Sequence, residues 1–508
     1  MIDGSSVSIL REPELEFRYG QRLQDPRNGL SLFGPYDAKS PSCPGSITYA
    51  VVGTPEGIEQ FHQFSAGLSH PVVSDPEVYN PRIWRPFPGF GAAFGSSWPD
   101  QAAWTFTLDR DILIRASRLG DAHLRAYTLV DQYLEALAIA SQRDEQFDLF
   151  FCIVPEEVYL YCRPKSSVPT WKRTGPRPSA DERRLRQQGQ ASLFGEWDPE
   201  QYRYSVDFRR QLKARSMAYD IPVQLLRDTT LRLTDTPDAA PYSRGLTPLS
   251  DRAWNITSTA YYKAGGKPWR LATAREGVCY IGLAFRQTEV GTDNRSACCA
   301  AQMFLDTGDG IVFKGEYGPW FSPREGQFHL TADAAFQLLS GVLETYRALE
   351  GKPLTEVFLH SRSGIREDEF EGYRKAVPEG VKLVGVRVRP ESSTGVKLYR
   401  PGTRPVLRGT LWKQDDRTAF LWGSGFVAAL ATYPGAEVPR PIRLDIQHGV
   451  ADIEQVAYDI LGLTKLNYNA CHLGDRLPVT VGFSAKVGEI LVGNLPITKA
   501  HPQFRFYI

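Results

Sequence analysis

The sequence predicts an α/β protein built from two layered domains, and three observations carry this prediction. The chain has 508 residues, whereas one domain usually takes about 100–200 residues. Short apolar runs typical of buried strands alternate along it with stretches of helical periodicity. A helical pattern ends in two glycines and a proline within residues 264–269, and new strand-like runs begin after it. We therefore expect one domain over residues 1–266, including an N-terminal segment, and a second over residues 267–508.

Composition and charge exclude several classes of protein. Hydrophobic residues make up 42%, aromatic residues 12% and charged residues 23% of the chain, outside the ranges of disordered, collagen-like and membrane proteins. Lys and Arg number 59 against 58 Asp and Glu, so a polyanionic partner would have to be held by a local cluster of cations. The 7 cysteines are scattered without zinc-site spacing, and the sequence has neither a signal peptide nor a membrane-length apolar segment. We expect a cytoplasmic protein with reduced thiols.

The first predicted elements belong to one half of a β–α–β unit. Residues 47–53 (ITYAVVG) form a short apolar run that predicts a buried strand. Residues 121–140 carry apolar side chains at three- and four-residue steps, which predicts a helix. After a polar turn, residues 147–155 (FDLFFCIVP) predict a second buried strand. Residues 163–190 are rich in Arg, Lys, Pro and Ser, so we expect an exposed, mobile loop whose basic side chains suit either solvent or a phosphate backbone.

Further apolar stretches predict the sheet of the second domain. Residues 279–285 (CYIGLAF) and 355–361 (TEVFLHS) each have the length and composition of a buried strand. Residues 298–320 contain two strand-like runs, and Asp306 to Gly310 predict the hairpin turn that joins them. A separate sheet indicates a separate domain.

One helix of the first domain carries an unusual pair of cations. Arg209 and Lys213 are four residues apart within residues 207–218, so both project from one helical face and repel each other unless solvent or an anion neutralises them. The strand-like run 221–226 follows, and it places Gln224 opposite its apolar side chains. The helix and the strand together can form an anion pocket, although a solvated helix face is the commoner meaning of such a pair.

Four separated segments resemble the short prokaryotic Argonautes, in the same order along the chain. They are residues 21–36 (QRLQDPRNGLSLFGPY), 208–231 (FRRQLKARSMAYDIPVQLLRDTTL), 254–271 (WNITSTAYYKAGGKPWRL) and 463–491 (LTKLNYNACHLGDRLPVTVGFSAKVGEIL). The resemblance implies a Rossmann-like MID domain followed by an RNase H-like PIWI domain, without the PAZ domain of longer Argonautes. It also implies a short guide strand whose 5′-phosphate is bound by the MID domain.

The resemblance assigns the residues of this phosphate pocket one by one. It implies that Lys213, Gln224 and Lys263 bind the guide 5′-phosphate. Arg209 stands where the family usually has an aromatic residue or His beside the first nucleotide, and a guanidinium can still stack on a base or bind phosphate. Family members commonly use the terminal carboxylate to hold a divalent cation, which implies a Mg²⁺ site at Ile508 and Gln224.

The PIWI half is expected to bind nucleic acid without cutting it. RNase H-like domains that cleave hold two metal ions with four side chains, mostly carboxylates. Ala284 stands where the resemblance places the first Asp and Ser361 where it places the second, and neither can ligate a cation as an anion. The sequence from Leu491 to Ile508 has no Asp or Glu, which leaves His501 as the sole ionisable candidate for the final ligand.

The resemblance therefore implies guide-dependent nucleic-acid binding, with an RNA guide and a single-stranded DNA target. It further implies an effector partner that carries an Argonaute-associated (APAZ) domain with a TIR, SIR2-like or nuclease domain and acts against plasmids or phage. One alternative is an active guide-directed nuclease with shifted metal ligands, drawn from Asp306, Asp309, Glu316 or Asp368. Another is a guide-free scaffold with a vestigial pocket, for which Arg209 is the only hint in the sequence.

Overall fold

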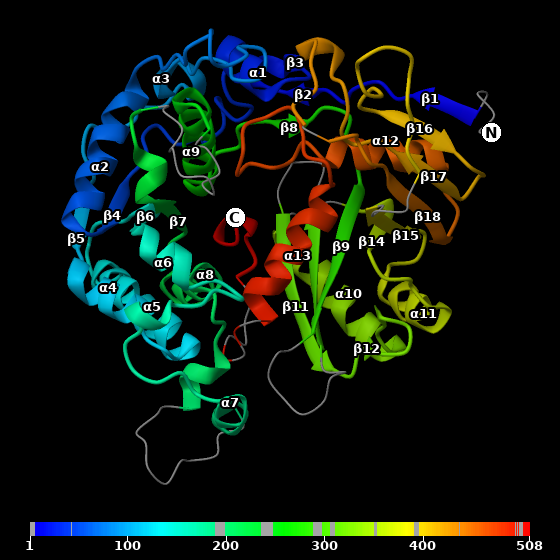
Figure 1. The fold of residues 1–508 in the computed structure, drawn as a ribbon. Helices are drawn as coiled ribbons and strands as arrows, with labels where there is room; N and C mark the ends of the chain where they lie inside the picture. The colour runs from blue at the N-terminus through cyan, green and yellow to red at the C-terminus, as the bar shows by residue number, and fades with distance from the viewer. Residues whose placement is uncertain are drawn as a thin grey trace.

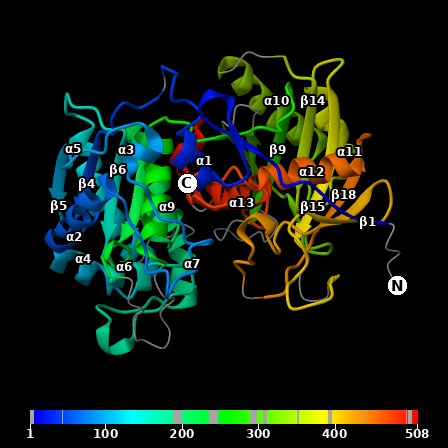
Figure 2. The same ribbon diagram turned by 90° about the horizontal axis from the view of Figure 1, so that it is seen from above.

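The computed structural model contains two large β-sheets side by side, and the C-terminal segment lies between them in both ribbon views (Figures 1 and 2). It describes residues 6–41, 43–187, 199–234, 247–287, 297–304, 310–349, 353–390, 396–435, 437–492, 494, 496 and 501–508. Among the helices in these ranges, none is long and apolar enough to cross a membrane.

The first sheet is parallel throughout, with its strands in the order β5-β4-β6-β7. These strands are β4 (Tyr49–Gly53), β5 (Trp104–Thr107), β6 (Leu149–Val154) and β7 (Val223–Arg227). One face is covered by α4 (Arg110–Ser117), α5 (Ala122–Ala140) and α8 (Phe208–Ser216), and the other by α2 (Pro55–Ala66) and α9 (Leu249–Lys263). Because both faces are covered, every residue of β4 and β6 is buried. The predicted Rossmann-like arrangement is confirmed.

The second sheet has the strand order β1-β16-β17-β18-β15-β14-β9-β10-β11. Its centre consists of β9 (Val278–Gln287), the antiparallel β10 (Ala297–Phe304) and β11 (Gly310–Gly318), and β14 (Glu356–Ser361) and β15 (Lys382–Pro390), which run parallel to β9. Helices α10 (Ala332–Leu349) and α11 (Glu367–Ala376) pack on one face, and α12 (Ile453–Leu463) and α13 (Val479–Val492) on the other. The predicted RNase H-like sheet is confirmed, while most of the turn predicted at 306–310 lies outside the described residues.

The N-terminal segment contributes to the second sheet rather than to the first. Strand β1 (Val7–Ile9) pairs antiparallel with β16 (Thr410–Lys413). The other strands at this edge are β17 (Thr418–Leu421) and β18 (Ile442–His448). Residues that we grouped with the first domain, over 1–266, therefore add an edge strand to the sheet of the second. A strand of 3 residues carries too little periodicity to reveal this pairing from sequence.

A buried ionic cluster holds the N-terminal segment against the second half. Glu12 accepts hydrogen bonds from Lys465 Nζ at 2.7 Å and from Arg408 Nε at 3.0 Å. Burial alone would raise the pKa of Glu12, but the two cations outweigh it and lower that pKa. The N-terminal segment is thus fixed by charge pairing as well as by strand pairing.

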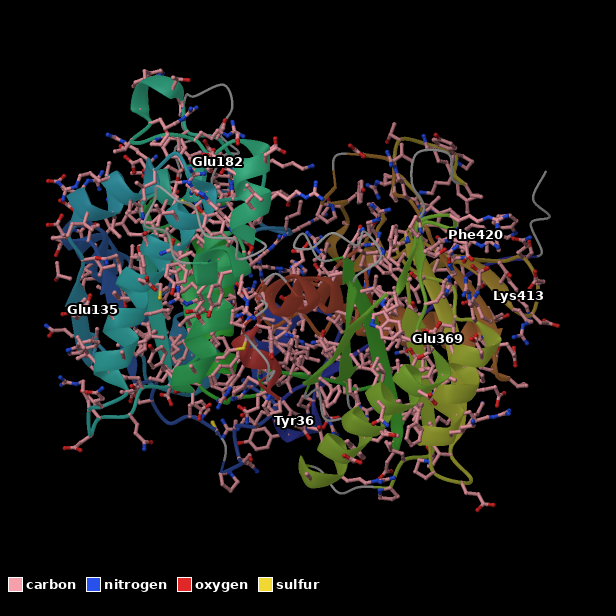
Figure 3. The ribbon with its side chains drawn as sticks, turned by 90° about the horizontal axis from the view of Figure 1, so that it is seen from below. Tyr36, Glu135, Glu182, Glu369, Lys413 and Phe420 are labelled. Atoms are coloured by element: carbon pink, nitrogen blue, oxygen red, sulfur yellow. The ribbon has the colours of Figure 1, made fainter. Side chains whose placement is uncertain are left out.

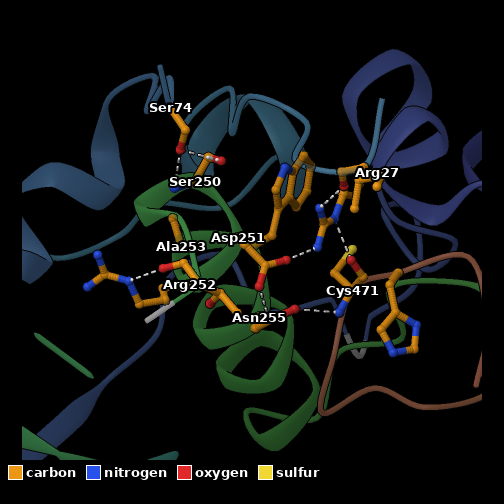
Figure 4. A network of polar contacts seen from close by, with 12 residues as sticks. Arg27, Ser74, Ser250, Asp251, Arg252, Ala253, Asn255 and Cys471 are labelled. Carbon is orange, nitrogen blue, oxygen red and sulfur yellow. Dashed lines mark hydrogen bonds and ion pairs between the residues drawn. The ribbon is translucent and has the colours of Figure 1, made fainter. Parts of the chain in front are cut away.

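A second buried network joins α1 (Pro26–Phe33), α9 and the segment before α13 (Figure 4). Arg27 forms an ion pair with Asp251 and donates to the main-chain oxygen of Cys471. Asn255 Oδ1 accepts a hydrogen bond from Cys471 N at 2.9 Å. The side chains of Arg27 and Asp251 are only 4% and 7% exposed. Three of the four segments that carry the family resemblance therefore meet in the folded chain.

Part of the segment that we expected to be a mobile loop is helical. Helix α7 (Ala180–Gln187) begins with a capping box, in which Ser179 Oγ accepts from Glu182 N at 3.1 Å and Glu182 Oε2 accepts from Ser179 N at 2.7 Å. Arg186 of this helix pairs with Asp121 at the start of α5, at 3.1 Å. The expectation of a mobile loop is therefore wrong for residues 180–187, and 188–190 lie outside the described residues.

Candidate nucleic-acid interface

Helices α8 and α9, strand β7 and the segment 501–508 bring two lysines together. Lys263 Nζ donates to the main-chain oxygens of Ile508 at 2.5 Å, Val223 at 3.0 Å and Arg505 at 3.1 Å. Lys213 Nζ donates to the same Ile508 oxygen and, at 3.5 Å, to that of Val223. Ile508 is 2% exposed, so the segment is packed into the first half rather than frayed. The structure thus brings together three of the residues that the resemblance assigned to the pocket.

Both ammonium groups are buried without a carboxylate side chain as partner. Lys213 is 2% exposed and Lys263 is 0% exposed, and within the described part of the chain neither pairs with Asp or Glu. Burial, followed by repulsion from Lys263 and Arg209, holds the pKa of Lys213 well below its usual range. Burial and the charge of Arg209 lower the pKa of Lys263 to about 7. An anion would restore the charged state of both lysines, and phosphate oxygens are strong acceptors for it.

Gln224 contributes an amide oxygen that has no partner among the described residues. Its Nε2 donates to the Leu225 oxygen at 3.3 Å, whereas its Oε1 is buried and unpaired. This oxygen and the Ile508 oxygen are hard donors of the kind that Mg²⁺ prefers. The neighbouring ammonium groups of Lys213 and Lys263 repel a cation, so the residues fit Mg²⁺ only when an anion binds with it.

Two exposed cations flank the buried pair. Arg209 lies one turn before Lys213 on α8 and is exposed. After burial, the charge of Arg209 is the main cause that lowers the pKa of Lys486 on α13, so the two positive charges repel each other. We did not predict Lys486, because its place beside Arg209 depends on how α13 packs between the halves.

Helix α13 connects the two halves beside the pocket. Its Glu489 pairs with Arg210 of α8 at 2.6 Å and with Arg286 of β9 at 3.6 Å. Gly282 lets α13 lie close against β9, because a Cβ atom there would stand 1.9 Å from the Thr480 oxygen. The pocket is therefore held in a defined position relative to the second sheet.

Comparison with known proteins gives a clear result for structure and none for sequence. The sequence matches no protein-family model, and none of the curated proteins matches it significantly. The structure is similar to that of Clostridium butyricum Argonaute bound to a guide DNA and a 19-mer target DNA, with a TM-score of 0.63 and 13% identity over 99% of this chain and 54% of that one. For Drosophila Piwi the TM-score is 0.56, with 13% identity over 99% and 55% of the two chains. For A. aeolicus Argonaute the TM-score is 0.54, with 12% identity over 98% of this chain and 55% of that one.

The chain has the Argonaute fold. It spans about half the length of these solved structures, and the half it spans contains both sheets described above. The predicted order of a MID-like sheet followed by a PIWI-like sheet is therefore confirmed.

In this Argonaute fold the two predicted degenerate metal positions lie on neighbouring strands but on opposite faces of the sheet. Ser361 is the register partner of Leu283 in the parallel pair of β14 and β9, so its side chain shares the face that α10 covers. Ala284 points to the other face, where Gly488 of α13 packs at 3.5 Å. The side chains of Ala284 and Ser361 therefore do not face each other, because side chains alternate along a strand.

Of the four acidic residues that we considered as alternative metal ligands, the structure describes the side chain of one. Asp306 and Asp309 lie outside the described residues, as does the side chain of Glu316. Asp368 is exposed in the first turn of α11. Within the ranges that the structure describes, no group of three or more His, Cys, Asp or Glu side chains could hold a metal ion.

His501 has a structural partner in the first half. Its Nε2 lies 2.9 Å from Asp220 Oδ1, and its ring packs on Phe506 with centroids 3.6 Å apart. Burial lowers the pKa of His501 despite the Asp220 carboxylate. The residue thus fastens the segment 501–508 beside the lysine pair.

Proposed function

We propose that the chain binds the 5′-phosphate of a guide strand between Lys213 and Lys263 and pairs that guide with a complementary target strand. The observation that carries the proposal is this pair of buried ammonium groups, whose described partners are main-chain oxygens. Lys263 directs three hydrogen bonds to such oxygens and Lys213 two, and a phosphate beside Lys213 would relieve the repulsion between the two neighbouring ammonium groups. Arg209, exposed at the rim, is proposed to contact the first nucleotide.

The fold supports a guide and a target as the two ligands. Clostridium butyricum Argonaute was solved with a guide DNA and a target DNA, and Aa-Ago with an externally bound siRNA. We propose an RNA guide and a single-stranded DNA target here, from the resemblance in sequence to the short Argonautes. Specificity would then reside in base pairing, while the protein binds backbone and end groups.

Mg²⁺ is proposed as the accompanying cation. Gln224 Oε1 and the Ile508 oxygen would be its protein ligands, and the ion would neutralise guide phosphates that bind beside the lysines. Lys213 and Lys263 would meanwhile hold the phosphate oxygens and position the Ile508 oxygen.

The PIWI half is proposed to hold the paired strands without cutting them. Ala284 offers a methyl group where the resemblance places a carboxylate. The chain is proposed to be of the short kind that lacks a PAZ domain. Its effector activity would reside on a separate APAZ-containing chain with a TIR, SIR2-like or nuclease domain, switched on by target recognition in cytoplasmic defence against plasmids or phage.

Binding of a short 5′-phosphorylated RNA, compared with its 5′-hydroxyl twin, tests the phosphate pocket. At fixed salt we expect the phosphorylated RNA to bind at least about a hundredfold more tightly, since hydrogen bonds to charged groups contribute about 1.5–3 kcal/mol each. Phosphate binding favours the protonated lysine, so this preference is expected to shrink as the pH rises above about 7, the pKa of Lys263. Fluorescence anisotropy on either side of that pH measures both effects. Equal affinities for the two RNAs at every pH would show that the pocket is misassigned.

Incubation of the loaded protein with a labelled complementary DNA tests the non-cutting PIWI half. In Mg²⁺ or Mn²⁺ the target is expected to stay intact over hours, because Ala284 removes a carboxylate that would hold a metal ion. Denaturing gel electrophoresis checks the result. Cleavage that disappears on Asp368→Ala would support the active nuclease instead.

A further inference from the structure

A second cationic pocket lies in the first half, away from the two lysines. Its cavity of about 40 Å³ lies at the N-terminal end of α5 and beside α7. The charged and hydroxyl side chains in its lining are Arg125, Arg173, Arg177, Arg183, Ser166 and Ser167. One water needs roughly 10–15 Å³, so the cavity has room for a few waters or one phosphate group. Helix α7, marked by Glu182 in Figure 3, stands at the outer end of the first half, whereas the C-terminal segment lies between the halves (Figure 1).

The pocket contains a buried guanidinium that makes no ion pair with Asp or Glu within the described residues, although the charge of Asp121 acts on it. Arg125 is 3% exposed, and it donates to the main-chain oxygens of Tyr161, at 3.1 Å, and Leu119. The guanidinium also interacts with the Cys162 side chain, and no Asp or Glu belongs to the described lining. Asp121, nearby in sequence, caps α5 and pairs with Arg186. Positive charge is thus concentrated here with no carboxylate in the lining to balance it.

An exposed aromatic side chain stands beside this pocket. Trp171 is 81% exposed, and Lys172 Nζ lies 4.7 Å from the centre of its ring. Val168 and Arg173, just before and after it in the chain, both line the cavity. Residues 163–187 contain eight Lys or Arg against two Asp or Glu. Exposed aromatic rings between cations are typical of surfaces that bind single-stranded nucleic acid by stacking and phosphate contacts.

We propose that the arginine pocket and Trp171 form a second binding site for single-stranded nucleic acid. A backbone phosphate would sit among Arg125, Arg177 and Arg183, and a neighbouring base would stack on Trp171. The site shares no residue with the Lys213 and Lys263 pocket, so it goes beyond the function proposed above and does not depend on it. Because it contacts backbone and ring faces, it would bind strands of any sequence.

A 5′-hydroxyl single-stranded RNA tests this site, because it lacks the end group that the lysine pocket would recognise. For Arg177→Ala/Arg183→Ala we expect about tenfold weaker binding and a slope of log affinity against log salt that is smaller by about 0.7, as for one lost phosphate contact. Arg177 is exposed and Arg183 partly exposed, so both replacements are compatible with folding. Lys165→Ala/Arg184→Ala removes two exposed cations of the same segment from outside the lining and is the matched control.

Two further variants separate the possible outcomes. Trp171→Ala is expected to weaken binding about tenfold, whereas Trp171→Phe retains most of it, as stacking requires. The 5′-hydroxyl end of the RNA keeps this test independent of the guide pocket. An arginine double variant that behaves like its control would overturn the proposal. So would an effect of that double variant on inorganic phosphate or a polyglutamate peptide alone, since the pocket would then serve a free anion or an acidic protein.

Discussion

Replacing Lys213 by alanine is expected to lower the affinity for a 5′-phosphorylated RNA by about a hundredfold and to leave the affinity for its 5′-hydroxyl twin unchanged. Lys213 makes two hydrogen bonds to main-chain oxygens, whereas the other ammonium of the pocket, on Lys263, is directed at three. Losing one or two charge-assisted hydrogen bonds to phosphate corresponds to roughly 2.7 kcal/mol, or two factors of ten. Fluorescence anisotropy with both RNAs at one salt concentration measures the effect.

Two other variants keep this result interpretable. Lys213→Met fills the buried site without charge, so a loss shared by both variants comes from the ammonium rather than from a cavity. Arg215→Ala removes a cation from the same helix, where Arg215 pairs with Asp131 at 2.6 Å, and is expected to keep the phosphate preference. If Lys213→Met binds the phosphorylated RNA as tightly as the wild type does, the pocket does not recognise phosphate.

Replacing Asp251 by alanine is expected to reduce the free energy of unfolding by about 3–5 kcal/mol. The change leaves the Arg27 guanidinium buried, with a side chain only 4% exposed and its ion-pair partner gone. The carbonyl of Cys471 still accepts one hydrogen bond from Arg27, but it cannot balance a full charge. Urea denaturation followed by circular dichroism measures the loss.

An exposed ion pair gives the matched control for this prediction. Arg374 and Glu371 lie on α11 with side chains 64% and 35% exposed, so Arg374→Ala is expected to cost less than about 0.5 kcal/mol. The double variant Arg27→Met/Asp251→Leu is expected to recover part of the stability lost in Asp251→Ala, because it removes both buried charges. A loss of equal size in the double variant would mean that packing around α9, rather than the unpaired charge, sets the cost.

Periodicity predicted the elements whose apolar faces are continuous. The strands β4, β6, β9 and β14 and the helix α5 lie where the sequence placed them. Helix α7 was missed, although its signal is present: Ser179 and Glu182 stand three residues apart and form the capping box seen in the structure. A polar helix shows little apolar periodicity, so composition alone suggested a loop.

The pocket could be assembled from sequence only through resemblance. Lys263 and Ile508 are 245 residues apart, and no local pattern links them. Lys486 and the arginine pocket depend on how helices pack, which periodicity does not encode. By contrast, the side of the sheet on which the Ser361 side chain lies can be derived. It follows from the alternation of side chains along β14, once the register of β14 against β9 is known.

The two buried ionic networks also constrain the order in which the chain can fold. Glu12 and Lys465 are separated by 453 residues and Arg27 and Cys471 by 444. At a synthesis rate of about 5–20 residues per second, the earlier members wait roughly 20–90 s on the ribosome before their partners emerge. Closing contacts of this length is entropically costly, so the last folding step is expected to be slow and to close the N-terminal segment onto an already formed body. The N-terminal segment is therefore expected to dock last, and its charged side chains stay solvated until the second half has been synthesised.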